Sequence, residues 1–417
     1  MKDLGLTPDG RLLFATRSLR LFAYGFLSVI LMIYLAAIGL SETQIGLLFT
    51  LTLLGDTIVS LWISTSADRI GRRRMLAAGS VLMVFAGLLF ATTDNFSLLL
   101  IAATIGIISP SGYEVGPFLP IEQAALSQVV RGEKRTLVFS WYNLLGSFTT
   151  ALGALFGGGL TQLLQGLGMV PVESYRTVIA TYALAGVVLC LLFTRLSGAV
   201  EVSHRPAARE PGRLLGLHRS KKTVFKLSAL FSLDAFAGGF VLQSIVAYWF
   251  HIRFDAQPAL LGTIFFGANV LAGISALSAA RIASRIGLVR TMVFTHIPSN
   301  ILLMLVPLMP NPPLAVAMLL VRFSISQMDV PTRQSYTMAV VSPDERSAAA
   351  GVTGIARTTG ASLSPILAGP LIAKASLLNV PFFLSGGLKI IYDLMLYRSF
   401  RSRRPPEEES GKADAGS

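Results

Sequence analysis

The chain has 417 residues, of which 53% are hydrophobic and only 14% are charged. A soluble protein carries about 25% charged residues, and a water-soluble core cannot enclose this much apolar sequence, so the expected solvent is a lipid bilayer. The net charge of +13 does not indicate nucleic-acid binding, because the basic residues gather in short connections between apolar runs.

Twelve apolar runs are long enough to cross a hydrocarbon core of about 30 Å at about 1.5 Å per residue. They lie at residues 17–39, 44–66, 75–93, 97–129, 136–165, 172–195, 224–250, 258–282, 290–309, 313–341, 347–374 and 378–398. Lys and Arg concentrate at alternate connections, which predicts cytoplasmic termini in a bacterial-type inner (plasma) membrane. The sequence therefore predicts an all-α membrane protein with twelve transmembrane helices.

The connection between the second and third runs contains four arginines within six residues, together with a glycine that permits a tight turn. The simplest interpretation is a cytoplasmic loop that only fixes topology. Its residue order resembles the signature loop between helices 2 and 3 of the major facilitator superfamily, with Ser64 where that signature usually has glycine. The resemblance implies a conformational-switch loop formed by Asp68, Arg69, Gly71, Arg72 and Arg73.

The two halves of the chain repeat each other at an offset of 211 residues. Residues 120–123 in the fourth run recur as residues 331–334 in the tenth, and each stretch begins with proline. The repeat predicts six-helix bundles at 12–195 and 224–400, a cytoplasmic linker at 196–223 and a disordered tail at 401–417. This organisation resembles the major facilitator fold of two pseudo-symmetric six-helix bundles, which implies that spans 1, 4, 7 and 10 line a central cavity.

Ionisable side chains inside the apolar runs are the candidate functional groups, because a charge at the bilayer centre costs at least about 2.5 to 3.5 kcal/mol on insertion scales. The candidates for proton coupling or substrate binding are Glu114, Asp329, Asp56, Asp234, Arg322 and Arg357. The alternative interpretation of each is a structural ion pair between helices. Arg20 and Lys374 lie near span ends, where long side chains can extend to the interface instead.

Two of the expected cavity-lining spans place charges on one helical face. In span 4, Glu114 and Glu122 are eight residues apart, and in span 10 Arg322, Asp329 and Arg333 follow a helical spacing. Glu114 is the leading candidate for a proton-carrying group, because its own span offers no cation one helical turn away.

Glu122 and Arg333 occupy equivalent positions of the repeat and carry opposite charge, each two residues after a matched proline. We predict that they form a gate, approaching when the cytoplasmic side closes and separating when it opens. The alternative is that each side chain finds its partner inside its own half.

The sequence contains no catalytic or metal-ligand motif, and its four histidines are scattered. We therefore expect no enzyme activity, no cofactor, no metal and no nucleic-acid partner. The predicted function is secondary active transport of a small molecule by alternating access, as proton-coupled efflux by a monomer in the lipid bilayer. The alternatives are an uptake permease for a small organic anion, favoured by Arg322, Arg333 and Arg357, and a non-transporting membrane sensor or scaffold.

Overall fold

The structure is a computed structural model that describes residues 6–130, 135–201, 217–342 and 345–401. In these ranges the regular secondary structure is helical. Most of the predicted linker, at 202–216, and all but the first residue of the predicted disordered tail lie outside the described residues.

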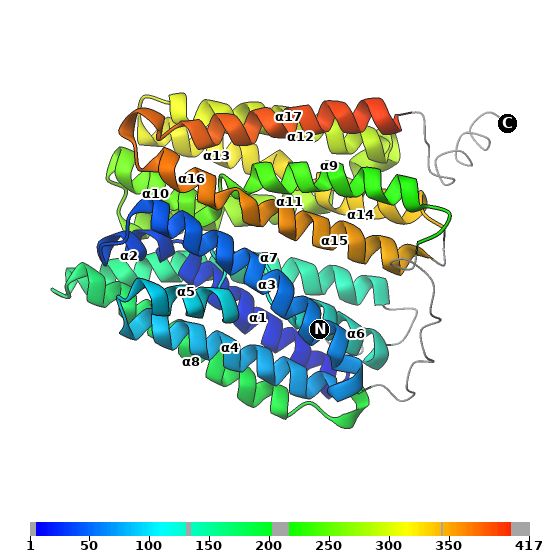
Figure 1. Ribbon diagram of the computed structural model, residues 1–417, viewed down its shortest axis with the longest axis horizontal. Helices are drawn as coiled ribbons and strands as arrows, with labels where there is room; N and C mark the ends of the chain where they lie inside the picture. The colour runs from blue at the N-terminus through cyan, green and yellow to red at the C-terminus, as the bar shows by residue number, and fades with distance from the viewer. Residues whose placement is uncertain (1–5, 131–134, 202–216, 343–344, 402–417) are drawn as a thin grey trace. The chain divides into compact units, whose positions relative to one another are not determined.

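The helices of the first half correspond to predicted spans 1 to 6 (Figure 1). They are α1 (Pro8–Ser28), α2 (Leu31–Ala37), α3 (Glu42–Ile70), α4 (Arg72–Thr92), α5 (Phe96–Ile105), α6 (Phe118–Val129), α7 (Arg135–Gly166), α8 (Pro171–Thr194) and the short η3 (Gly198–Val200).

The helices of the second half correspond to predicted spans 7 to 12. They are α9 (Lys221–Gly239), α10 (Gln243–Phe254), α11 (Pro258–Ile286), α12 (Leu288–Leu305), η5 (Val306–Leu308), α13 (Pro312–Ser326), α14 (Asp329–Ala339), α15 (Arg346–Leu363), α16 (Pro365–Ile372), η7 (Ala375–Leu377) and α17 (Val380–Phe400).

In the described part, nine helical segments are long and apolar enough to cross a membrane, or ten if α1 and α2, bent by 44°, form one span. The other two predicted spans are each divided into shorter helices, α5 with α6 and α15 with α16. All twelve predicted spans are therefore helical, but several are broken.

The break in span 4 corrects the expectation that Glu114 and Glu122 share one face of a continuous helix. Helix α5 ends at Ile105 and α6 begins at Phe118, so Glu114 lies in a non-helical segment. Gly112 and Gly116 adopt positive φ values of 73° and 84° there, a conformation that ends a right-handed helix. Asp56 of α3 binds this segment, because its Oδ1 accepts a hydrogen bond from the Gly116 N–H at 2.7 Å.

The described chain divides into two compact units, the first comprising Met1–Ala207 with Leu242–Val270 and the second Ala208–Val241 with Leu271–Ser417. In the first unit α1 packs along α7 and α4 along α8. A β-carbon at Gly153 of α7 would lie 2.1 Å from the Phe22 carbonyl oxygen of α1. Glycine therefore allows the two backbones to touch, as small residues do between membrane helices.

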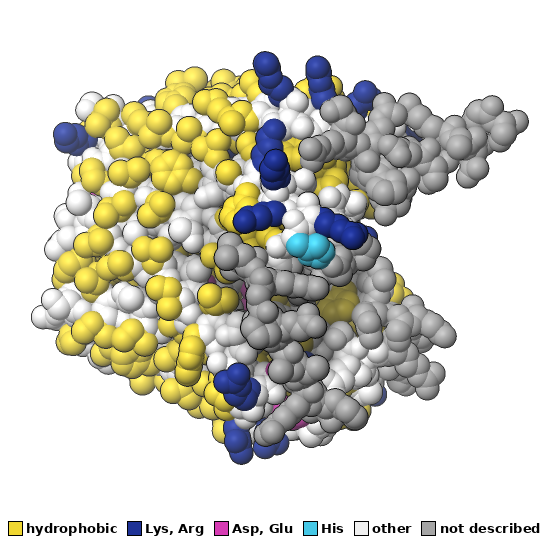
Figure 2. Space-filling model, turned by 45° about the vertical axis from the view of Figure 1, so that its right-hand side comes forward, with side chains coloured by type: hydrophobic (Ala, Val, Ile, Leu, Met, Phe, Trp, Pro, Cys, Tyr) yellow, Lys and Arg dark blue, Asp and Glu magenta, His cyan; other side chains and the backbone are white. Residues whose placement is uncertain are grey.

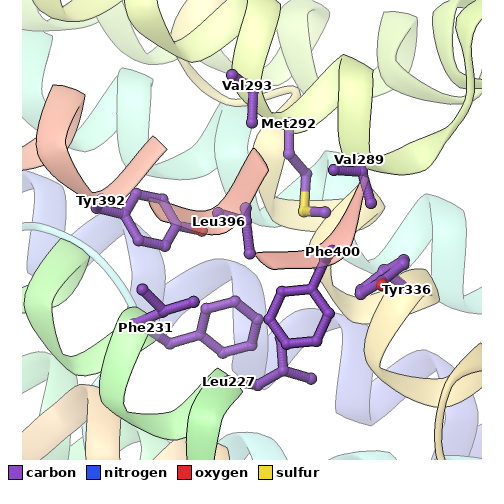
Figure 3. Close-up of a cluster of buried hydrophobic side chains, with 10 residues drawn as sticks. Leu227, Phe231, Val289, Met292, Val293, Tyr336, Tyr392, Leu396 and Phe400 are labelled. Carbon is purple, nitrogen blue, oxygen red and sulfur yellow. The ribbon is translucent and has the colours of Figure 1, made fainter. Parts of the chain in front are cut away.

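In the second unit α9 packs against α15 and α17, and α12 packs against α17. Figure 3 shows the apolar core formed by α9, α12, α14 and α17. Its members are Leu227, Leu230, Phe231, Val289, Met292, Val293, Tyr336, Tyr392, Leu396 and Phe400. Phe231 and Tyr392 of this core also border the charged residues described below.

Large apolar side chains point outward from many of the helices, as expected of a surface that faces lipid. Trp62, Phe156 and Leu191 are among them, each more than half exposed. Figure 2 shows hydrophobic side chains over a broad part of one face, with most of the visible Lys and Arg side chains in a band beside them.

Candidate functional site

The first unit buries an arginine–glutamate cluster that consists of Arg17, Arg20, Glu114 and Glu122. Arg20 donates through Nη1 and Nη2 to the two oxygens of Glu122, at 2.7 Å each, and both side chains are 0% exposed. Arg20 Nε and Arg17 Nη1 donate to the two oxygens of Glu114, at 2.8 and 3.0 Å. Two guanidinium groups thus balance two carboxylates, which is the arrangement that makes buried charge tolerable.

Neighbouring helices complete the hydrogen bonds of this cluster. Thr16 donates to Glu122 at 3.0 Å, and the Tyr142 hydroxyl donates to the other oxygen of the same carboxylate. The Arg17 guanidinium also lies over the Tyr142 ring, 4.3 Å from its centroid. Glu122 is therefore held by α1, and by α7 through Tyr142.

One expectation about this region was wrong, and the argument for Glu114 was incomplete. Arg20 does not extend to the interface, because its guanidinium is fully buried between two carboxylates. Glu114 has two cations beside it, supplied by α1 and not by its own span. Spacing along one span cannot reveal a partner that arrives from another helix.

The second unit buries an aspartate cluster centred on Asp234 of α9. The Asp234 Oδ1 accepts a hydrogen bond from Lys389 Nζ of α17 at 2.7 Å. Its Oδ2 lies 3.1 Å from Arg333 Nη1 of α14 and 3.5 Å from Arg357 Nη1 of α15. Arg333 also donates to Asp329, one helical turn earlier, at 3.0 Å. Four of the predicted site residues, Asp234, Asp329, Arg333 and Arg357, therefore meet at one place.

A histidine joins this cluster. The Nδ1 of His296, on α12, lies 2.9 and 3.1 Å from the two oxygens of Asp393 on α17. Its Nε2 lies 4.0 Å from Asp234 Oδ1. Sequence reasoning treated His296 as one of four scattered histidines, because its partner is 97 residues away in the chain. The sequence feature that could have singled out His296 was its position inside an apolar run.

The remaining predicted residues of the membrane spans, Asp56 and Arg322, have contacts of their own. Asp56 accepts from Ser60 at 3.1 Å in addition to Gly116. Arg322 lies over the ring of Phe323 on its own helix, at 4.9 Å. The continuous face expected in span 10 is interrupted, because α13 ends at Ser326 and α14 begins at Asp329.

Glu122 and Arg333 each have partners within their own unit. Glu122 is bound by Arg20, and Arg333 by Asp234 and Asp329. The two pairs are charge-inverted counterparts, since α1 supplies the cation to α6 in one repeat and α9 supplies the carboxylate to α14 in the other. The gate between Glu122 and Arg333 stays a prediction, and it requires both side chains to exchange partners.

The loop between α3 and α4 is fixed from two sides. Gly71, at φ 118°, separates α3 from α4, and Arg72 Nε donates to Asp68 Oδ1 at 2.8 Å. Glu201 accepts the backbone N–H groups of Arg72 and Arg73, at 2.7 and 3.2 Å. A carboxylate thus caps the amino end of α4, where the helix dipole favours negative charge.

A second carboxylate performs a similar task in the second unit. Glu345 accepts hydrogen bonds from the backbone N–H groups of His218, Arg219 and Ser220, just before α9. Burial opposes ionisation of this carboxyl, but the N–H groups outweigh it and hold the pKa of Glu345 at about 2.

The family model of the Major Facilitator Superfamily matches residues 13–365 and 254–416. The chain belongs to the major facilitator superfamily. It is accordingly an integral, multi-pass membrane transporter of the twelve-helix fold and not an enzyme.

Two sequence relatives match this chain over very different lengths. Over 93% of its length the chain is 32% identical to an uncharacterised membrane protein of Saccharomyces cerevisiae, 93% of which is covered. It is 25% identical to the quinolone resistance protein NorA of Staphylococcus aureus over 139 residues, which cover 33% of this chain and 34% of NorA.

Two solved structures show the same fold. A bacterial homologue of the human lysosomal transporter Spinster matches with a TM-score of 0.72 and 16% identity, covering 94% of this chain and 96% of that one. The nucleoside transporter NupG matches with a TM-score of 0.76 and 14% identity, covering 94% and 100%.

Proposed function

We propose that this transporter exports a small molecule in exchange for protons, by alternating access. The supporting observation is that the membrane-spanning helices of each unit bury a set of opposite charges, the arginine–glutamate cluster and the aspartate cluster. Ionisable groups in membrane spans mark substrate and proton pathways in transporters. The partial similarity to a quinolone resistance protein also favours efflux over uptake.

A second candidate function is uptake of a small organic anion. Its support is Arg357, whose side chain is 34% exposed and whose closest carboxylate contact is the 3.5 Å approach to Asp234. A guanidinium that is only partly neutralised can bind the carboxylate or phosphate of a substrate through its remaining N–H groups.

We also propose roles for individual residues. Glu114, Asp329, Asp56, Asp234, Arg322 and Arg357 are proposed to bind substrate or protons, and the loop from Asp68 to Arg73 to control the conformational change. The alternation of basic connections favours cytoplasmic termini in an inner or plasma membrane. We propose that the working form is a monomer, because each unit balances its buried charges internally.

Reconstitution in proteoliposomes separates the candidates. Labelled solutes, including a fluoroquinolone and small organic anions, are tested for counterflow and then for accumulation driven by a pH gradient. A proton-coupled exporter concentrates its substrate in an acidic lumen, because protons leave as substrate enters. A proton-coupled uptake permease concentrates it in an alkaline lumen. Absence of counterflow for every solute contradicts both transport assignments and favours the sensor or scaffold.

A further inference from the structure

The carboxylate of Asp393, on α17, is 0% exposed and has an unusual basic partner. It contacts the imidazole of His296 at 2.9 Å and accepts a hydrogen bond from Asn300 Nδ2 at 3.3 Å, both on α12. Lys389, one turn earlier on α17, binds Asp234 instead. The carboxylate of Asp393 therefore relies on a histidine for its positive charge.

The four other carboxylates of the two clusters contact arginine or lysine. Glu114 and Glu122 bind Arg20, and Asp234 and Asp329 bind Arg333. A guanidinium does not release its proton in proteins, so the cation of each of those pairs is permanent. Imidazole is the side chain that gains and loses a proton between about pH 5 and pH 8.

The position of His296 connects its proton to the aspartate cluster. With Nδ1 donating to Asp393, the second ring nitrogen faces Asp234 at 4.0 Å. A protonated ring donates toward both carboxylates, whereas a neutral ring turns a lone pair toward Asp234 and leaves Asp393 without a counter-charge. The loss of one proton thus weakens the contact between α12 and both α9 and α17, since an uncompensated buried charge is strongly unfavourable.

Charged groups approach this site from four helices, α9, α14, α15 and α17. Arg333, Arg357 and Lys389 lie against Asp234 and Asp329, whereas the cationic contact of Asp393 is His296. The titratable and charged groups around His296 are Asp393, Lys389 and Tyr392 on α17, Asp234 on α9, Asp329 and Arg333 on α14 and Arg357 on α15.

The apolar core of the second unit shields the pair. The Tyr392 ring lies edge-on to the imidazole of His296, with centroids 6.1 Å apart. In Figure 3, Tyr392 and Leu396 of α17 lie beside Phe231 of α9 within the apolar core. The exposed fraction of His296 is 5%, so the imidazole is almost completely excluded from solvent.

We propose that the His296–Asp393 pair binds the proton that drives transport, and that Asp234 transmits its release to the cations of α14, α15 and α17. This inference rests on the proposed proton-coupled transport, but it assigns the proton to residues that the sequence argument did not select.

The first test measures the proton directly and needs no substrate. The full chain is labelled with nitrogen-15 histidine in nanodiscs, with His204, His218 and His251 replaced by glutamine so that one imidazole remains. We expect the His296 signal to change from protonated to neutral between about pH 5 and pH 9. Adding Asp393→Asn removes the opposing charge, so a smaller fraction of His296 is protonated at each pH. A signal that stays in one form throughout overturns the proposal.

The second test asks whether the proton controls conformation. Spin labels are attached at Thr65 and Ser284, two exposed positions in different units, in a Cys190→Ser background. We expect the distance distribution to differ between about pH 5.5 and about pH 8, and His296→Gln to abolish that difference. The control is His251→Gln on α10, whose imidazole contacts the backbone oxygen of Ala256 and whose loss leaves the pH response intact.

Different results would contradict the proton assignment to His296 and the proposed transport function. If His296→Gln keeps the full pH response, the coupling proton lies elsewhere even though the protein transports. If proteoliposomes show no counterflow for any solute, the proposed function is wrong whatever the histidine does.

Discussion

Arg20 and Glu122 form a two-bonded ion pair, with both N–O distances at 2.7 Å and neither side chain exposed. The pair joins α1 to α6, the second half of the broken span 4. Because each charge is excluded from solvent, neither residue can be lost without leaving the other uncompensated.

Replacing one partner of this pair should therefore cost more stability than replacing both. We expect Arg20→Met to lower the free energy of unfolding by about 3 to 5 kcal/mol, because Glu122 is left without its cation. Adding Glu122→Leu should recover most of the loss, since Arg17 and Glu114 still balance each other. Thermal unfolding in detergent measures both variants. Arg176→Met, which breaks an exposed pair with Asp94, is the control and should cost no more than about 1 kcal/mol.

Two double charge swaps separate the gate from the internal pairs. If Glu122 and Arg333 form a gate, each single reversal lowers the counterflow rate, and the double variant Glu122→Arg with Arg333→Glu recovers part of it. The internal pair predicts recovery from a different combination, Arg20→Glu with Glu122→Arg. Rescue by the internal swap alone contradicts the gate, and both swaps must be compared at equal amounts of folded protein.

Asp68→Asn should slow transport while leaving the fold intact. The Asp68 carboxylate accepts from Arg72, but Arg72 also binds Gln128 at 2.8 Å and the Val200 carbonyl at 3.1 Å, so the loop keeps its anchors. We expect the counterflow rate to fall by roughly tenfold, the size of a typical coupling between conformational states, with an unchanged melting temperature. Wild-type transport by this variant would leave the loop with a topological role only.

Glu345 should make stability depend on acid pH. Its pKa of about 2 lies below the ordinary value of 4.5, so its contribution to stability is complete above about pH 4.5 and is lost as the pH falls toward 2. We expect Glu345→Gln to lower the melting temperature at pH 7, and the difference from the wild type to shrink progressively below pH 4.5. Glu173→Gln, at an exposed position, is the matched control. A constant difference across that range contradicts the prediction.

The fold could be predicted from the sequence because each span has its own long run of apolar residues. Length and apolarity identified all twelve spans, and the order of residues around Asp68 and Gly71 indicated the superfamily. The repeat of residues 120–123 at 331–334 also directed attention to Glu122 and Arg333, which the structure places in the two buried clusters.

The partners of these charges could not be predicted, because they come from other helices. Glu114 was interpreted from its own span, yet its cations are Arg17 and Arg20 of α1. His296 is paired with Asp393 across 97 residues. A one-dimensional pattern records spacing within a helix, whereas the packing of α12 on α17 depends on the whole second unit.

Helix α3 is attached at two points that have separate tasks. Asp56 holds the Gly116 N–H in the broken segment of span 4, and Asp68 binds Arg72 at the loop between α3 and α4. Twelve residues of uninterrupted helix separate them, a distance of about 18 Å. Because the helix between them is uninterrupted, we expect a displacement of the loop to shift the segment that contains Glu114 as well.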